Sequence, residues 1–140
     1  MTETISPQTA LIYTMVMMSA SDRDMTDAEL QTMGDIVKHL PVFRDYDLSK
    51  ISGAAANCAE LLADPDGLEK ALELIAQTLP AKIHETAYAL ACEVAVADRS
   101  INQEEVRILE LIRHGLGVDR LVAAGIERGA RARHQPPAQP

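Results

Sequence analysis

The sequence has very few aromatic residues: tryptophan is absent, phenylalanine occurs once, and aromatic residues make up 3% of the 140 positions. β-Sheets rely on aromatic and β-branched side chains that pack across a pleated surface, so this composition argues against a β-sandwich. Hydrophobic residues still amount to 47%, enough for a single domain of this length to bury one core. A core of Ala, Leu, Ile, Val and Met predicts closely packed helices, and we expect an all-α fold.

Cysteine is also scarce, because Cys58 and Cys92 are the only two. Neither belongs to a CxxC or Cys/His metal pattern, and both lie in apolar helical surroundings, so we expect buried thiols. No hydrophobic run approaches the ~20 residues of a membrane-spanning helix. The start of the chain carries no basic, apolar leader. We therefore expect a cytoplasmic protein that does not insert into a membrane.

Positive charge is in deficit, since 13 Lys and Arg residues oppose 21 Asp and Glu residues and give a formal net charge of −8. Nucleic acids and anionic lipid surfaces attract basic proteins. The charge balance therefore argues against either as the main partner. An acidic surface instead suits cations or a basic region of a protein partner.

One short stretch occurs twice in the chain. Residues 21–30 read SDRDMTDAEL and residues 97–106 read ADRSINQEEV, and an offset of 76 positions aligns Asp22 with Asp98. Each copy follows an apolar helical run and leads into a second helical pattern. The chain is therefore predicted to contain two helix–acidic turn–helix units.

The second half of each copy has the spacing of a capping box, Thr26 with Glu29 and Asn102 with Glu105. In this motif the Thr or Asn oxygen accepts from the third helical amide, and the Glu accepts from the amide of the cap residue. Each cap stabilises its helix by about 1 kcal/mol. Both glutamates thus have a structural role that needs no ligand.

Asp22 and Asp98 have no such immediate explanation. Each ends an apolar helix, where the macrodipole is negative and a carboxylate costs roughly 0.3–1 kcal/mol. Hydrogen bonds from nearby turn amides, as in an Asx-turn, would offset this cost. A calcium or magnesium ion shared with Glu29 or Glu105 would do the same. Both explanations stay open, and the turn is not an EF-hand because Met33 stands where that loop needs its bidentate Glu.

These turns resemble the TerB-like (tellurite-resistance) family, in which an apolar helix ends in Ala-Asp-Gly and a Glu follows seven positions after the Asp. The matching positions are Ala97, Asp98, Ile101 and Glu105, with a degenerate copy at Asp22, Met25 and Glu29. The resemblance implies an all-α domain with an internal repeat and an acidic surface proposed to bind divalent cations. It also implies a link to tellurite and chemical-stress resistance, as an adaptor working with membrane and cytosolic partners.

Arg23 and Arg99 depart from the family pattern, because they stand where the family has Gly. Gly after a helix end adopts the left-handed conformation readily, whereas Arg there would be strained. A guanidinium beside Asp22 or Asp98 would also bind the carboxylate as a built-in cation and make a metal unnecessary. Alternatively, both arginines point into solvent near a helix C-terminus.

The periodicity and the capping signals predict seven helices in one domain over residues 7–130, between disordered ends at residues 1–6 and 131–140. Asp64 and Pro65 are expected to start the fourth helix, and Gly115 to cap the sixth. The predicted helices cover residues 7–20, 27–39, 48–63, 65–79, 83–96, 103–114 and 118–130.

A second group, His84, Tyr88 and Cys92, shares one helix face because its members are four positions apart. His84 and Glu85 resemble the start of a zinc-protease helix, but Tyr88 stands where that helix has its second His. We therefore expect no catalytic site and no enzyme. The run of Met15, Met17 and Met18 is interpreted as flexible core filling rather than a soft-metal site.

Our main hypothesis is a non-enzymatic stress-response adaptor of the TerB-like kind. The candidate metal ligands are Asp22, Glu29, Asp98 and Glu105, and the expected cofactor is a divalent cation, calcium or magnesium. The expected partners are proteins, including membrane-associated stress-resistance proteins, and not nucleic acid. The alternative hypothesis is a purely structural protein-interaction module without a metal site.

Overall fold

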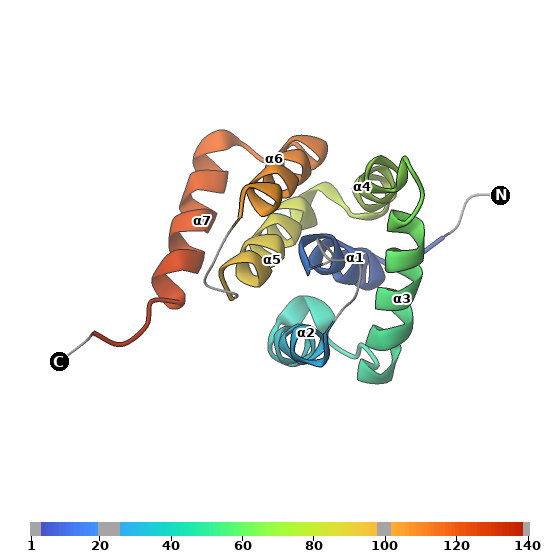
Figure 1. The fold of residues 1–140 in the computed structure, drawn as a ribbon, viewed down its shortest axis with the longest axis horizontal. Helices are drawn as coiled ribbons and strands as arrows, with labels where there is room; N and C mark the ends of the chain where they lie inside the picture. Colours follow the sequence, from blue (N-terminus) through green and yellow to red (C-terminus); the bar gives the residue numbers. More distant parts are fainter. Residues whose placement is uncertain (1–3, 20–25, 98–101, 139–140) are drawn as a thin grey trace.

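The computed structural model describes residues 4–19, 26–97 and 102–138 (Figure 1). Their secondary structure is helical without any strand, which confirms the all-α prediction. The seven α-helices are α1 (Pro7–Ser19), α2 (Asp27–His39), α3 (Ile51–Leu62), α4 (Gly67–Thr78), α5 (His84–Ala97), α6 (Gln103–Leu116) and α7 (Arg120–Arg133). Three short 3-10 helices connect them: η2 (Pro41–Phe43), η3 (Leu48–Lys50) and η4 (Ala81–Ile83).

Helix α1 lies in the middle of the molecule and packs against α3, α4 and α5 (Figure 1). Every residue from Ala10 to Ser19 is buried. A helix that is apolar on all sides has no face for solvent, so it is stable only when other helices surround it. Met15, Met17 and Met18 are at most 1% exposed, which confirms them as core residues.

Helix α5 forms the second layer of the core, because α1, α6 and α7 all pack against it. Ala87, Ala91 and Ala95 recur every four positions along α5, and none is exposed. Such small side chains let neighbouring helices approach closely. The single Phe, Phe43, is buried against the core from η2.

The turn between α3 and α4 differs from our prediction. Helix α4 begins at Gly67, after Asp66, and not at Pro65 with Asp64 as its cap. A β-carbon at Gly67 would lie 2.2 Å from the backbone oxygen of Leu61. The start of α4 therefore touches the end of α3, and only glycine fits at this point of contact.

The end of α6 also differs. The helix continues to Leu116, and Gly117 rather than Gly115 is its C-cap, with a left-handed φ of 65°. Gly115 instead lies within α6, where a β-carbon would be 2.7 Å from the Leu72 side chain of α4. Gly115 allows α6 to pack closely against α4, and Gly117 allows the left-handed turn that ends α6.

Helix α7 starts at Arg120, where Asp119 accepts hydrogen bonds from the amides of Leu121 and Val122 at 3.1 and 3.4 Å. It continues past the predicted end at Ala130 as far as Arg133. Arg133 forms an ion pair with Glu93 of α5, and His134 Nε2 lies 2.5 Å from the same carboxylate. These contacts with α5 explain the longer helix.

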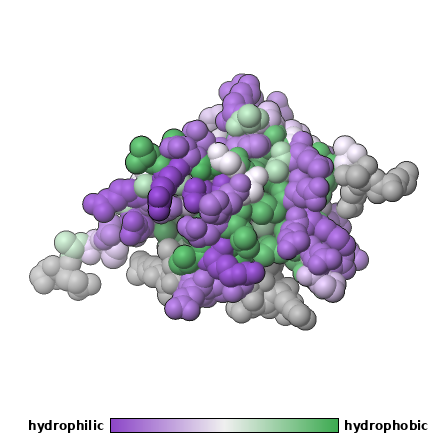
Figure 2. Space-filling view, turned by 90° about the horizontal axis from the view of Figure 1, so that it is seen from above, coloured by the Kyte–Doolittle hydropathy of each residue, from purple (hydrophilic) through white to green (hydrophobic). Residues whose placement is uncertain are grey.

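Hydrophilic residues cover much of the face shown in Figure 2, with hydrophobic areas between them. The large hydrophobic residues that are exposed belong to separate elements: Leu40, Leu48, Val106 and Leu121. No helix in the described ranges combines the length and the apolar composition that crossing a membrane requires.

Candidate functional site

The two predicted capping boxes lie beside one hollow of about 410 Å³. Among the described residues, its walls come from the ends of α1 and α5 and the starts of α2 and α6. The lining residues are Met18, Ser19, Thr26, Ala28, Glu29, Thr32, Val94, Ala97, Asn102 and Glu105. The structure thus brings the two capping boxes together.

The internal repeat explains this convergence. Helices α1 and α2 correspond to α5 and α6 at the offset of 76 positions. Helix α1 makes its most extensive contact with α5. Because the first helices of the two units pack against each other, their ends and the starts of the following helices reach the same region of the surface.

The capping box of α2 has the predicted geometry. The Glu29 amide donates to Thr26 Oγ1 at 3.1 Å, and the Thr26 amide donates to Glu29 Oε1 at 3.0 Å. The Thr26 hydroxyl also lies 3.0 Å from Glu29 Oε1. Only one carboxylate oxygen of Glu29 takes part in the cap, so Oε2 is left for another contact.

The capping box of α6 repeats this arrangement with Asn102. The Glu105 amide donates to Asn102 Oδ1 at 2.8 Å, and the Asn102 amide donates to Glu105 Oε1 at 3.2 Å. Glu105 is only 6% exposed, although it is charged. Buried carboxylates are uncommon unless they are paired or hydrogen-bonded, and here too the cap uses one oxygen.

Two of the four predicted metal ligands, Glu29 and Glu105, thus lie on one hollow. Asp22 and Asp98, together with Arg23 and Arg99, lie outside the described residues. Within the described ranges, no three His, Cys, Asp or Glu side chains come close enough to hold a metal ion. The hollow therefore offers two carboxylates from the described part of the chain.

Sequence reasoning missed Ser19 and Thr32, which also line this hollow. Ser19 is the last residue of α1 and is 8% exposed, and the Thr32 hydroxyl donates to the carbonyl of Ala28 at 3.1 Å. Neither residue belongs to the repeated motif. Their place in the hollow follows from how the helices pack, so no spacing in the sequence marks them.

His84 lies between the ends of two helices. Its Nδ1 lies 2.9 Å from the carbonyl of Leu116, the last residue of α6, and its Nε2 lies 3.0 Å from the carbonyl of Leu79, which follows α4. The carbonyls at a helix end lack partners within the helix. His84 therefore connects the ends of two helices from the start of α5.

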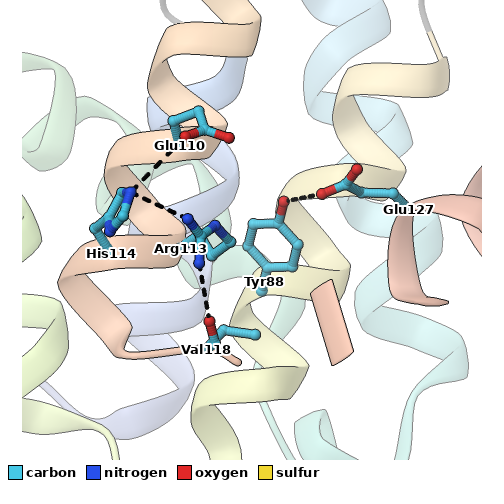
Figure 3. A network of polar contacts seen from close by, with 6 residues as sticks. All are labelled: Tyr88, Glu110, Arg113, His114, Val118 and Glu127. Carbon is cyan, nitrogen blue, oxygen red and sulfur yellow. Dashed lines mark hydrogen bonds and ion pairs between the residues drawn. The ribbon is translucent and has the colours of Figure 1, made fainter. Parts of the chain in front are cut away.

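Tyr88 faces α7, where its hydroxyl donates to Glu127 Oε2 at 2.5 Å (Figure 3). Cys92 interacts electrostatically with the same glutamate. Burial, followed by this hydrogen bond, raises the pKa of Tyr88 well above its ordinary value. Figure 3 also shows Arg113 of α6, whose Nη1 donates to the carbonyl of Val118 at 3.4 Å. The contact of Tyr88 with Glu127 joins α5 to α7, and that of Arg113 with Val118 joins α6 to the turn that follows it.

Both cysteines are buried, as predicted, and burial raises the pKa of Cys58 and of Cys92 from about 9 to about 12. The folded protein therefore holds these thiol protons more tightly than the unfolded chain does. The resulting stability is complete below pH 9 and is lost as the pH rises through 12.

We expect the free energy of unfolding, measured in urea from pH 8 to 12, to fall less steeply with pH in a Cys58→Ala/Cys92→Ala variant than in the wild type. Equal slopes would contradict this.

A family model described as tellurite resistance protein TerB matches residues 8–126. The chain belongs to the TerB family. The match includes both capping boxes and all of α1 to α6 except Pro7, so the hollow is built entirely from the TerB domain. Searches of curated proteins and of solved structures find no match. The TerB assignment confirms the resemblance inferred from the two acidic turns.

Proposed function

We propose that this TerB domain is a non-enzymatic stress-response adaptor that binds a divalent cation between its two acidic turns. The observation that carries the proposal is the convergence of Glu29 and Glu105 on one hollow. Each capping box stabilises its own helix locally. The packing of α1 against α5 then brings the two boxes, and with them two carboxylates from separate copies of the motif, to the same part of the surface.

The donor atoms in the hollow fit a hard cation. Glu29 and Glu105 each have an oxygen, Oε2, that the caps do not use, and the Thr26 and Asn102 side chains add neutral oxygens nearby. Carboxylate and amide oxygens suit calcium or magnesium. The lining residues that the structure describes include no Cys or His, the usual ligands of zinc. We propose that Asp22 and Asp98 complete the ligand set.

Such an ion would join the two repeats, because its ligands come from the starts of both α2 and α6. A bound cation would also remove part of the negative charge of an acidic protein, whose formal net charge is −8. The surface around the hollow would then differ between the loaded and the free protein. We propose that protein partners, including membrane-associated stress-resistance proteins, recognise this surface.

The second candidate is a structural interaction module that binds no metal. It is favoured by the completeness of the two capping boxes, which account for one oxygen of each glutamate without any ligand. Arg23 and Arg99 would then neutralise the aspartates in place of an ion. The two candidates differ in whether a cation changes the stability of the domain.

A thermal-unfolding experiment with calcium, magnesium or a chelator tests the proposal. A cation at about 100 times its dissociation constant is expected to stabilise the wild type by about 2.7 kcal/mol, a rise of several degrees in Tm. In a Glu29→Gln/Glu105→Gln variant this rise should disappear. Glutamine can still act in a capping box, so this variant removes the charges and keeps the caps.

A Glu60→Gln/Glu69→Gln variant is the matched control, since it removes two charges from α3 and α4, which do not line the hollow. It should keep the full cation-dependent rise. An Asp22→Asn/Asp98→Asn variant tests the remaining proposed ligands and should lose the rise. If no cation raises the Tm of the wild type, the cation site is wrong and the structural module is the better description.

A further inference from the structure

Helix α7 lies at one edge of the molecule, and α5 is its main neighbour (Figure 1). No other helix in the described part of the chain makes extensive contact with it. Helix α7 buries only two of its residues, Ala123 and Ala130, whereas α6, of the same length, buries three large apolar side chains. Stabilisation by burial grows with the apolar area removed from water. The hydrophobic contact that holds α7 is therefore small.

The sequence of α7 also gives the helix little stability of its own. Gly125 and Gly129 lie in its interior, where glycine is less favourable than alanine. Packing requires neither glycine, since a β-carbon at Gly125 would meet no atom within 4 Å and one at Gly129 would be 3.7 Å from the Arg133 side chain. A helix of 14 residues is marginal in water by itself. Helix α7 therefore depends on its contact with α5.

Two polar contacts join α7 to α5. In the middle of α7, Glu127 Oε2 accepts a hydrogen bond from the Tyr88 hydroxyl at 2.5 Å. At the end of α7, Arg133 and His134 both contact the carboxylate of Glu93, whose side chain is only 17% exposed. Hydrogen bonds to ionised groups are stronger than those between neutral groups. We call Glu93, Arg133 and His134 the latch.

The connection between α6 and α7 allows α7 to move as a unit. Val118 is buried and fixed to α6, because its amide donates to the Arg113 carbonyl at 3.0 Å and its carbonyl accepts from Arg113 Nη1 at 3.4 Å. One exposed residue, Asp119, separates Val118 from the first residue of α7. A change in the backbone angles at Asp119 would swing α7 away from α5 and leave α6 in place.

Two side chains of α5, Tyr88 and Cys92, lie beneath α7, and each is 2% exposed. They line a hollow of about 210 Å³ together with Glu127 and Arg131 of α7 and Leu109 of α6. This hollow separates α7 from α6, so α7 is attached on its α5 side. Movement of α7 away from α5 would make both side chains accessible.

We propose that α7 is a lid that opens from α5 while α1 to α6 stay folded, and that it controls access to Tyr88 and Cys92. Proteins open locally where few buried apolar contacts hold a segment, and α7 has this property. The latch and the hydrogen bond from Tyr88 to Glu127 keep the lid closed. No residue of α7 lines the hollow at the capping boxes, so the lid goes beyond the proposed cation site and does not depend on it.

Thiol labelling with DTNB tests the lid, because one cysteine lies beneath it and the other lies in the core. Cys58 of α3 is fully buried, and its Sγ lies 3.7 Å from the carbonyl of Tyr13 on α1. The variants Cys58→Ala and Cys92→Ala each keep one thiol, and each labelling rate is divided by the rate in the urea-unfolded chain. We expect Cys92 to react more than about tenfold faster than Cys58, since only the lid must open to expose it.

In the chain that keeps only Cys92, Glu93→Gln removes the negative charge of the latch and is expected to raise the labelling rate about tenfold. Glu85→Gln is the matched control on α5, since Glu85 is exposed and forms no ion pair within the described ranges. The control should leave the rate unchanged. Equal rates in the two variants would overturn the proposal, because Cys92 would then be reached without release of the latch.

Ile75→Val distinguishes lid opening from unfolding of the whole domain. Ile75 is fully buried on α4, which makes no extensive contact with α7. The substitution leaves a small cavity and should lower the urea concentration at which the domain unfolds. Because the core stays folded when the lid opens, the labelling rate of Cys92 should not change. If Cys92 reacts no faster than Cys58, or if Ile75→Val accelerates its labelling, only global unfolding exposes Cys92 and α7 is not a lid.

Discussion

Replacing Gly67 by alanine is expected to destabilise the domain by about 3 kcal/mol or more. The added β-carbon would lie 2.2 Å from Leu61 O and 2.8 Å from Leu62 Cα, and both are backbone atoms. A side chain can rotate away from such a contact, but a helix end cannot move without disturbing its own hydrogen bonds. Urea unfolding of Gly67→Ala beside the wild type measures the effect.

Gly53→Ala is the control for this prediction. Its β-carbon would meet no atom within 4 Å, so only the change in helix propensity remains. We expect this variant to be more stable than the wild type by about 0.5–1 kcal/mol. Replacing glycine by alanine is thus expected to lower the free energy of unfolding at Gly67 and to raise it at Gly53. If Gly67→Ala unfolds at the same urea concentration as Gly53→Ala, the contact between α3 and α4 is not as close as described.

Replacing His84 by alanine is expected to destabilise the domain by about 2–3 kcal/mol. The substitution removes the partner of two carbonyls, Leu79 O and Leu116 O, at the ends of α4 and α6. A neutral imidazole has one N–H and a protonated imidazole has two, so the ring donates to both carbonyls only when it is protonated. Either form contributes a link between three helices that alanine cannot replace.

His39→Ala is the matched control. His39 is also bonded to a carbonyl, since its Nδ1 lies 2.7 Å from Asp35 O, but it is exposed and the contact stays within α2. Water can replace the His39 ring at this carbonyl, so we expect His39→Ala to lower the free energy of unfolding by less than about 0.5 kcal/mol. Denaturation curves of the two variants separate a link between helices from a local surface contact. Similar losses in both would contradict the role given to His84.

Local chemistry made part of the fold predictable from the sequence. The start of α2 was predicted correctly because Thr26 and Glu29 form their capping box within a single helical turn. The capping box at Asn102 and Glu105 was predictable for the same reason. Such motifs depend only on residues three positions apart, so no knowledge of the tertiary structure is needed.

Features that depend on packing between distant segments were not predictable. Gly115 and Gly117 both resemble helix-ending glycines, and only the position of Leu72 on α4 shows that Gly115 belongs inside α6. The convergence of the two capping boxes likewise requires α1 to pack against α5. The Tyr46 hydroxyl has no hydrogen-bond partner among the residues that the structure describes, and nothing in the sequence indicates this. The candidate sites therefore became visible only with the tertiary structure.

The central position of α1 also affects how the domain folds during synthesis. Helix α1 is made before the helices that cover it, and its main neighbour, α5, is complete only at Ala97. At about 5–20 residues per second, the ribosome needs several seconds to supply α5 after α1. During this interval α3 and α4 are the main helices available to cover α1, and the face of α1 that packs against α5 stays uncovered. The nascent chain therefore exposes part of its central helix before the second repeat is made, and we expect it to depend on chaperones until α5 has emerged.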